Sequence, residues 1–482
     1  MSAFYTATDH FTLLPAILLA LFGCVALFFP KMSGLFSLVL GEVFAGVALW
    51  RQLNYLQDSG LSIQAFQGSL VVDGLSLFFN FLFVATGLLC GLISYRYLEV
   101  EGEHHGEYYG LMLLAQAGMF FLASGTELVT LFIGLETMAI AFYILVGFIR
   151  RDRRSNEAAM KYLLLGAFST GFLAYGFSLF YGLTGTTKLA GIAQGLAGVE
   201  SSNALLLLAI LTTAVGVFFK IAAAPFHMWT PDAYEGAPTP ITAYLSVASK
   251  AASFALLLRI FLGPLAAHRD VWEPLLVVVA IASLTIGNFA ALTQSNVKRM
   301  LAYSSISHVG YILLGLIAGN DTGYRGVLLY TLVYAFMNLG AFLVLVALRR
   351  RGGGLGGEHL DDLNGLMRKS PGYAILMVVF LLALAGIPPT AGFWAKYYIF
   401  IALIENHQYA LAIAGALYTA VSIYYYFRIV KAMFVAEERD AQPLASTAGI
   451  YITAAVTGLV TLGFGIFPEP VLRFVTATAG AR

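Results

Sequence analysis

The chain has 482 residues, of which 59% are hydrophobic and 11% are charged. Soluble proteins carry about 25% charged residues, so a soluble globular fold of this size is excluded. The formal net charge of +1 gives no indication of nucleic-acid binding. Cys24 and Cys90 lie far apart in apolar segments without a CxxC pair, so we expect no disulfide framework, metal site or iron–sulfur cluster.

Apolar segments follow one another along the whole chain, and a membrane-spanning helix needs roughly 20 apolar residues. We interpret the first segment as a retained helix, because no positive charge precedes it and no small-residue cleavage site follows it. The stretch 51–73 is interpreted as a polar loop. The sequence therefore predicts an all-α polytopic membrane protein. About fourteen spans are expected, near residues 11–30, 34–52, 74–95, 107–124, 126–148, 156–183, 203–226, 240–263, 272–293, 299–318, 325–348, 372–400, 408–434 and 448–467.

Lysine and arginine are distributed unevenly over the predicted loops. Loops that follow odd-numbered spans hold most of them, with clusters at residues 150–154 and 349–351, whereas loops after even-numbered spans hold few. Positively charged loops remain on the cytoplasmic side of a membrane. We therefore expect the odd-numbered loops in the cytoplasm and both termini on the non-cytoplasmic side.

Two predicted spans contain proline near their middles, Pro225 in the seventh and Pro388 with Pro389 in the twelfth. Proline removes a backbone donor and clashes with the preceding turn, so each helix should break there. Because the breaks are five spans apart, spans four to eight and nine to thirteen would form two inverted five-helix repeats, each with a proline-broken helix. The alternative is that both prolines merely kink their helices. The expected parts are a three-helix segment over 1–106, the two units over 107–265 and 266–435, and a C-terminal helix and tail over 436–482.

Five ionisable side chains within these spans are the first candidates for function: Glu136, Lys161, Lys220, Lys250 and Lys396. Such groups are costly at membrane depth and are seldom kept unless they carry ions or pair with a partner. A buried lysine can release its proton near neutral pH, which an arginine cannot do. The pattern therefore favours proton transport over static ion pairs that only hold helices together.

Each of these groups has an expected role. We expect Lys220 to be the first partner of Glu136, Lys250 to relay a proton onward and Lys396 to serve as the exit. Lys161 lies only about five residues into its span, so a relay role and snorkelling to the surface are equally open.

Histidines form the second group of candidates. His308 lies in the middle of the tenth span among serine hydroxyls, and histidine titrates closest to physiological pH. We favour a relay role for it over a merely hydrogen-bonded core histidine. His227 follows the first break and is expected to shape the loop there.

Two other patterns carry no chemistry in this interpretation. The run Glu103-His104-His105-Gly106-Glu107 lacks helical HExxH spacing, so a solvated loop is expected rather than a metal site. The glycine-rich stretch 352–357 lacks the features of a phosphate loop and is interpreted as a flexible linker. We find no haem, flavin or nucleotide motif in the sequence.

Several stretches between about residues 107 and 430 resemble the antiporter-like membrane subunits of respiratory complex I, most of all the subunit N branch of bacterial NADH–quinone oxidoreductase. They are Gly134-Leu-Glu136, Glu157-Ala-Ala-Met-Lys161-Tyr162, Lys220 with Pro225-Phe-His227-Met-Trp229, Thr230-Pro-Asp232-Ala-Tyr-Glu-Gly236-Ala-Pro238, Ala248-Ser-Lys250, Asn296-Val-Lys298-Arg299, Tyr303-Ser-Ser-Ile-Ser-His308, and Leu384-Ala-Gly-Ile-Pro388 with Lys396-Tyr-Tyr398.

The resemblance implies a fourteen-helix core and a set of site residues. The family's glutamate on helix five corresponds to Glu136, and its lysines on helices seven and eight correspond to Lys220 and Lys250. Its charge on helix twelve corresponds to Lys396, where lysine instead of glutamate argues against the subunit M branch. The implied activity is proton translocation driven by quinone reduction elsewhere in the complex.

The resemblance also implies that this chain holds no cofactor. Partner subunits are expected to carry FMN and iron–sulfur clusters, with quinone as substrate of the complex. The expected partners are another antiporter-like subunit and small hydrophobic membrane subunits, in a bacterial inner membrane. The alternative function is a subunit of a multisubunit cation/proton antiporter, and a third is a scaffold whose charges only join helices.

Overall fold

The computed structural model describes residues 5–28, 34–349, 356–437 and 446–480. Within these residues, twelve helical segments are long and apolar enough to cross a membrane. They are α1 (Ala7–Phe28), α2 (Gly34–Ser59), α3 (Gly74–Glu101), α5 (Leu128–Val146), α6 (Arg153–Thr184), α8 (Ala204–Ile221), a segment made of α10 (Thr239–Tyr244), the π-helical turn η2 (Leu245–Ser249) and α11 (Lys250–Phe261), then α12 (Arg269–Leu292, after the 3₁₀ turn η3, Ala266–His268), α13 (Val297–Ala318), α14 (Asp321–Leu348), α18 (Tyr409–Phe434) and α19 (Ala448–Ile466).

The two remaining predicted spans are also helical. They are α4 (Gly106–Ser124) and the interrupted pair α16 (Pro371–Ala385) and α17 (Ala391–Glu405). The all-α membrane fold is therefore confirmed. Shorter elements connect the spans: α7 (Leu189–Leu196), α9 (Trp229–Gly236), α15 (Leu366–Lys369), α20 (Glu469–Gly480), the 3₁₀ turns η1 (Phe66–Gly68) and η4 (Leu360–Leu363), and the strands β1 (Ile63–Ala65) and β2 (Leu70–Val72).

The predicted polar loop 51–73 was only partly correct. Helix α2 continues to Ser59, and the antiparallel strands β1 and β2 form a hairpin after it. The extra turns of α2 persist because Gln52 is buried and donates to the carbonyl of Phe11 at 2.7 Å, and because Leu56 packs against the hairpin. A polar stretch of sequence thus becomes an ordered cap on this end of the bundle.

Both proline-containing spans are interrupted where the sequence predicted. Helix α8 ends before Ala222 and α16 ends before Gly386, and both of these residues adopt the left-handed conformation, with φ of 61° and 81°. Each donates its N–H to the last carbonyls of the helix it terminates. The Ala224–Pro225 and Pro388–Pro389 peptide bonds are cis. The two breaks thus close their first half-helices in the same way, as expected of repeats that place ion sites at discontinuous helices.

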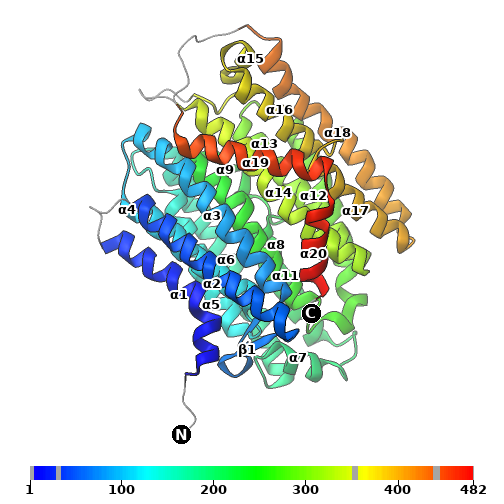
Figure 1. The fold of residues 1–482 in the computed structure, drawn as a ribbon. Coiled ribbons are helices and arrows are strands. Elements are labelled where there is room, and N and C mark those ends of the chain that lie inside the picture. The colour runs from blue at the N-terminus through cyan, green and yellow to red at the C-terminus, as the bar shows by residue number, and fades with distance from the viewer. Residues whose placement is uncertain (1–4, 29–33, 350–355, 438–445, 481–482) are drawn as a thin grey trace.

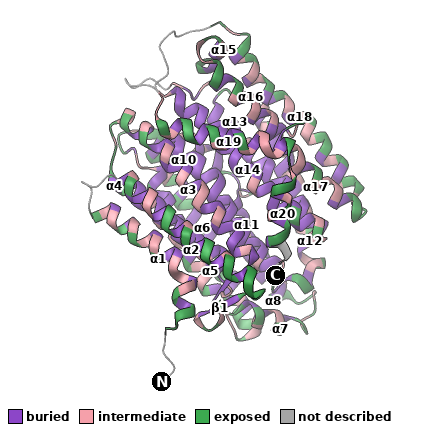
Figure 2. Ribbon diagram, viewed as in Figure 1, coloured by how far each residue is buried: buried purple, intermediate pink, exposed green. Residues whose placement is uncertain are grey.

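Burial is concentrated in the middle of the bundle. The α10–α11 segment is 100% buried, and α13 and α14 are each 94% buried over their most apolar windows, whereas α6 and α18 lie at the periphery with 39% and 28%. Figure 2 shows the central helices mostly in purple and α18 largely in green and pink. Side chains on α11 and α13 therefore lie in the most deeply buried part of the protein.

The basic loops meet at one end of the bundle. Arg151 and Arg349 both pair with Glu101, at 3.7 and 2.7 Å, and Lys298 and Arg349 both pair with Glu358, at 3.4 and 3.8 Å. All these residues lie in the connections after odd-numbered spans or at the helix ends that border these connections. Figure 1 shows α15 at this end and the N-terminus, β1 and α7 at the other. The alternation of spans inferred from the charges is thus reproduced by the fold.

Candidate functional site

The predicted site residues fall into two groups. Lys220, Lys250, His308 and Lys396 are all buried, each with no more than 4% of its surface exposed. They lie on α8, α11, α13 and α17, so they come from both of the predicted five-helix units. Glu136 on α5 is only half-buried, and Lys161 belongs to a surface network described below.

Glu136 and Lys220 are neighbours but do not form the contact ion pair suggested by the sequence. The carboxylate of Glu136 accepts a hydrogen bond from Thr170 on α6 at 2.8 Å. The ammonium of Lys220 donates to the hydroxyl of Tyr143 on α5 at 3.3 Å and lies within electrostatic range of Glu136. Since Tyr143 and Glu136 are on the same helix, α5 presents both a carboxylate and a hydroxyl to the lysine. Tyr143 thus takes the contact position expected for the carboxylate.

Lys250 reaches across the boundary between the two units. It is the first residue of α11, directly after the π-helical turn η2, and such turns are frequent at functional sites. Its ammonium donates to the backbone carbonyl of Ser305 on α13 at 3.3 Å and also to the Ser305 hydroxyl. The ring of Tyr234 lies 5.8 Å from the ammonium. A buried lysine is thereby held by neutral oxygens and an aromatic face.

His308 lies one helical turn along α13 from Ser305. Its Nδ1 is 2.7 Å from the hydroxyl of Tyr330, and its Nε2 is 3.1 Å from that of Tyr426. Tyr426 also shares a hydrogen bond of 2.5 Å with Ser304. Both ring nitrogens therefore have hydroxyl partners, which either donate or accept a proton. His308 lies within electrostatic range of both Lys250 and Lys396.

Lys396 is held at the second helix break. Its ammonium donates to the carbonyl of Ala385, the last residue of α16, at 2.9 Å. It also lies 4.6 Å from the centroid of the Tyr311 ring, which stacks on Tyr330 at 6.2 Å. A cation at a helix C-terminus complements the helix dipole. The break in α16–α17 thus provides the site that fixes Lys396.

Tyrosines fill the gaps between the charged residues. Tyr143 packs edge-on against Tyr162 with ring centroids 4.7 Å apart, and Tyr330 and Tyr311 connect His308 to Lys396. Sequence reasoning assigned no role to these tyrosines. Tyrosine hydroxyls in the middle of predicted spans could have suggested such a role. Which of them lie beside the charged residues, however, depends on which helices are neighbours in the fold.

Lys161 lies at the basic end of the protein, with 45% of its side chain exposed. It pairs with Glu157 and with Asp232, both at 2.8 Å, and Asp232 in turn pairs with Arg299 at 2.7 Å. Burial alone would raise the pKa of Asp232, but the hydrogen bonds from Lys161 and Arg299 lower it below its usual value. The network borders a cavity of about 220 Å³ that Glu235 also lines. The position of Lys161 is the surface one that snorkelling would give.

Sequence reasoning did not single out several buried ionisable residues, among them Glu42 and Lys298. Glu42 on α2 has 1% of its surface exposed and accepts from Gln116 on α4 at 2.8 Å. Lys298, assigned to a loop from the sequence, is the second residue of α13 and is buried, where it donates to the carbonyl of Ala237 at 2.7 Å. Glu42 interrupts the predicted second span, so the rule that identified Glu136 applies to it as well.

The remaining candidates, His104, His105 and the glycine-rich stretch 352–357, are separate from the buried lysines and His308. His104 packs against Tyr95 and Tyr109, while His105 approaches Glu103 at 3.3 Å. In the part of the chain that the structure describes, no group of three or more His, Cys, Asp or Glu side chains could hold a metal. Residues 352–355 of the glycine-rich stretch lie outside the described residues.

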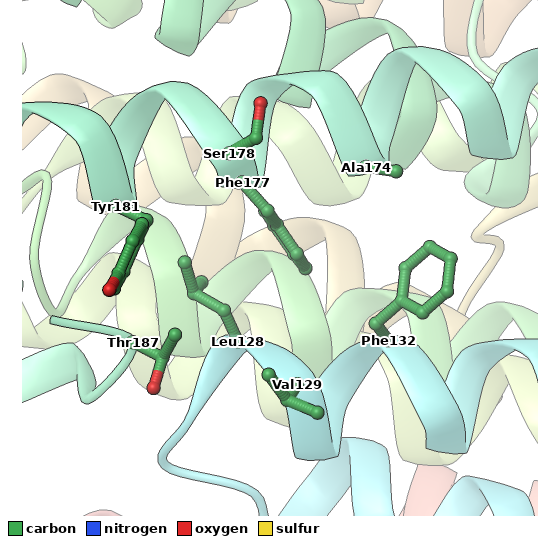
Figure 3. A pocket seen from close by; sticks show the side chains of 8 residues that line it. All are labelled: Leu128, Val129, Phe132, Ala174, Phe177, Ser178, Tyr181 and Thr187. Carbon is green, nitrogen blue, oxygen red and sulfur yellow. The ribbon is translucent and has the colours of Figure 1, made fainter.

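An apolar pocket of about 260 Å³ lies between α5 and α6 (Figure 3). Phe132 and Phe177 point into it, and none of its lining residues is a carboxylate, lysine or histidine.

Comparison with known proteins agrees with this geometry. The family described as NADH:quinone oxidoreductase/Mrp antiporter, transmembrane, matches residues 125–422. NADH-quinone oxidoreductase subunit N 2 of Solibacter usitatus is 58% identical over 98% of both chains. NADH-quinone oxidoreductase subunit N 1 of Koribacter versatilis is 53% identical over 89% of this chain and 85% of its own.

Solved structures show the same architecture. A chain of respiratory complex I from Thermus thermophilus superposes with a TM-score of 0.79 at 32% identity, over 96% of this chain and 98% of that one. A chain of the Mrp complex from Dietzia superposes with a TM-score of 0.84 at 22% identity, over 98% and 97%, which shows the shared fold alone. Since subunit N 2 of Solibacter usitatus is 58% identical over 98% of both chains and the family model covers residues 125–422, the chain belongs to the NADH-quinone oxidoreductase subunit N family of antiporter-like membrane subunits.

Proposed function

We propose that this chain translocates protons within the membrane arm of an NADH–quinone oxidoreductase, along a line from Glu136 and Lys220 through Lys250 and His308 to Lys396. The observation that carries the proposal is the contact of Lys250 on α11 with Ser305 on α13. It joins the polar groups of the first five-helix unit to those of the second. Without it, the two units would hold two separate clusters.

Each group on the line has a stated task. Glu136 lies within electrostatic range of Lys220 at the start of the line. Tyr143 contacts this lysine, and Ser305 receives the hydrogen bonds of Lys250. Hydroxyl groups both donate and accept, so they can pass a proton between groups that do not touch. His308 and its tyrosine partners continue the line to Lys396, from which protons leave on the side away from the basic loops.

Lysine suits this task because its charge is adjustable. A buried ammonium loses its proton when its stabilising neighbours change, whereas a guanidinium stays charged. The buried lysines of the line are held by neutral oxygens, so a small change of position or charge nearby alters their protonation. Translocation then needs a driving change from outside the chain, which quinone reduction in partner subunits would supply.

In this proposal the chain itself holds no cofactor and performs no electron transfer. FMN and iron–sulfur clusters belong to partner subunits, and quinone is the substrate of the complex. The partners in the membrane are another antiporter-like subunit and small hydrophobic subunits. The complex lies in a bacterial inner membrane, with the basic end of this chain in the cytoplasm and both termini on the other side.

A multisubunit cation/proton antiporter is the second candidate, favoured by the fold shared with the Mrp chain. Co-purification distinguishes the two functions. An affinity-tagged chain extracted under mild conditions should carry flavin and iron–sulfur absorbance and should oxidise NADH. Recovery with small hydrophobic subunits alone, without either chromophore, would contradict the complex I assignment and favour the antiporter.

A further inference from the structure

The proposed line does not use Glu42, which is the buried carboxyl group of α2. One of its oxygens, Oε2, accepts from the Gln116 amide at 2.8 Å, and the other, Oε1, has no hydrogen-bond partner among the described residues. Within the same residues no lysine, arginine or histidine nitrogen lies within 4.0 Å of the carboxyl. Its electrostatic neighbours are Cys90 and Tyr244. An isolated carboxylate in such surroundings would be very costly, and buried groups of this kind remain neutral instead.

Gly87 shows how the carboxyl and the amide face each other. A Cβ added to this glycine of α3 would collide with Oε1 of Glu42 and with Oε1 of Gln116. Both oxygens therefore face the same point of the α3 backbone, and no described residue donates a hydrogen bond to Oε1 of Glu42. Two acceptor oxygens repel when no proton lies between them, whereas a neutral acid supplies that proton. The amide N–H then donates to the carboxyl C=O, and the carboxyl O–H donates to the amide C=O.

From this geometry we propose that Glu42 is a neutral carboxylic acid locked reciprocally to Gln116, and that the pair is a positioning element for the helix that carries Lys250. Gln116 Oε1 also accepts from the hydroxyl of Tyr244 at 3.4 Å. Tyr244 is the last residue of α10, directly before the π-helical turn that leads to Lys250. The pair thus links α2 and α4 to this turn. The link to Lys250 rests on the proposed function, but the protonation and the pairing of Glu42 do not.

The cluster holds its proton and does not pass it on. Tyr244 packs against Phe142 with ring centroids 5.3 Å apart. Its hydroxyl makes one hydrogen bond among the described residues, to Gln116. Among the described residues, no hydrogen bond of the Tyr244 hydroxyl leads toward Lys250. A proton on Glu42 therefore has no hydrogen-bonded route onto the line.

Infrared spectroscopy tests the protonation directly. The spectrum of the purified complex with Glu42→Gln is subtracted from that of the wild-type complex at neutral pH. We expect the difference to contain the C=O stretch of a protonated carboxylic acid. A difference that contains the carboxylate stretches instead would overturn the proposal.

Two substitutions test the positioning role. Glu42→Gln keeps a reciprocal amide pair and should leave both the assembled complex and its protons per electron unchanged. Glu42→Leu leaves the Gln116 amide buried without its partner, which should lower the assembled complex several-fold on a native gel.

Three results would overturn the proposal. The first is a Glu42→Gln variant whose complex does not assemble. The second is a Glu42→Gln variant whose complex assembles but no longer pumps protons. The third is a Glu42→Leu variant whose assembled complex reaches the wild-type amount. The infrared and assembly measurements do not depend on pumping. If the proposed line through Lys220 failed its own test, these two results would still decide the state of Glu42.

Discussion

Lys250 and Ser305 form the contact that unites the two halves of the protein. The lysine is the first residue of α11 and the serine lies in α13, yet the ammonium donates to both the carbonyl and the hydroxyl of that one residue. The two helices are among the most deeply buried of the bundle. The charged residues of the first unit thus continue into the His308 cluster of the second.

Replacing Lys250 should interrupt the line. Lys250→Met removes the ammonium group at this junction and should lower proton translocation at least about tenfold, a loss of about 1.4 kcal/mol or more in barrier terms. Ser305→Ala should have a smaller effect, because the backbone carbonyl still accepts. NADH-driven acidification of vesicles measures both. Lys431→Met is the control, since Lys431 is exposed on α18. Equal activities of Lys250→Met and the control would show that the contact is not part of the path.

Gly386 should be irreplaceable at the second break. Its φ is 81°, and an added Cβ would lie 2.7 Å from Cδ of Lys396. The left-handed conformation alone costs a non-glycine residue about 1–2 kcal/mol, and the collision would move Lys396 away from Ala385. We expect Gly386→Ala to reduce both the assembled complex and pumping. Gly372→Ala, in the same broken span but with nothing within 4 Å of the added atom, should match the wild type. Similar levels of the two variants would refute the packing argument.

The Asp73–Arg259 pair should stabilise the far end of the Lys250 helix. The guanidinium binds both carboxylate oxygens, at 2.6 and 2.7 Å, and both side chains are mostly buried. Asp73→Asn keeps the cap of α3 but leaves the arginine uncompensated, so the stability of the complex should fall by about 3 kcal/mol. Thermal inactivation of the complex measures this loss. Neutralising the exposed Arg473 should change nothing, and an unchanged midpoint for Asp73→Asn would show that the pair is dispensable.

The surface network of Asp232 predicts a dependence on pH. Its pKa in the folded protein lies below its ordinary value of 3.8, since Lys161 and Arg299 hydrogen-bond the carboxylate and outweigh the opposing effect of burial. The stabilisation is therefore fully present above that ordinary value and is lost as the pH falls through the lower, folded value. Asp232→Asn should destabilise the complex at neutral pH, and the difference from wild type should shrink in acid. A difference that is constant with pH would contradict this assignment.

Much of the fold could be predicted from the sequence because membranes impose simple rules. Span length, proline position and loop charge located the helices, the breaks at Pro225 and Pro388, and the gathering of basic loops at one end. The extension of α2 to Ser59 and the hairpin β1–β2 were not predictable, since a polar sequence there is ordered by packing against α1.

The sequence was sufficient to predict which ionisable residues are buried at the candidate site, but not which side chains they contact. Lys220, Lys250 and Lys396 are buried as expected, whereas the contact of Lys220 is Tyr143 and not Glu136. Which tyrosine lies beside which lysine depends on the rotation and neighbours of each helix, and periodicity in one sequence does not give these. The argument that identified Glu136, an ionisable residue within a predicted span, also applies to Glu42.

The most direct test of the proton path uses inverted membrane vesicles that carry Lys220→Met. Quinone reduction by NADH and acidification of the vesicle lumen are recorded together, with the intact complex verified on a native gel and Lys431→Met as control. Our account predicts assembled complex with loss of acidification, alone or together with quinone reduction. An unchanged number of protons per NADH would show that Lys220 is structural and would contradict the proposed path.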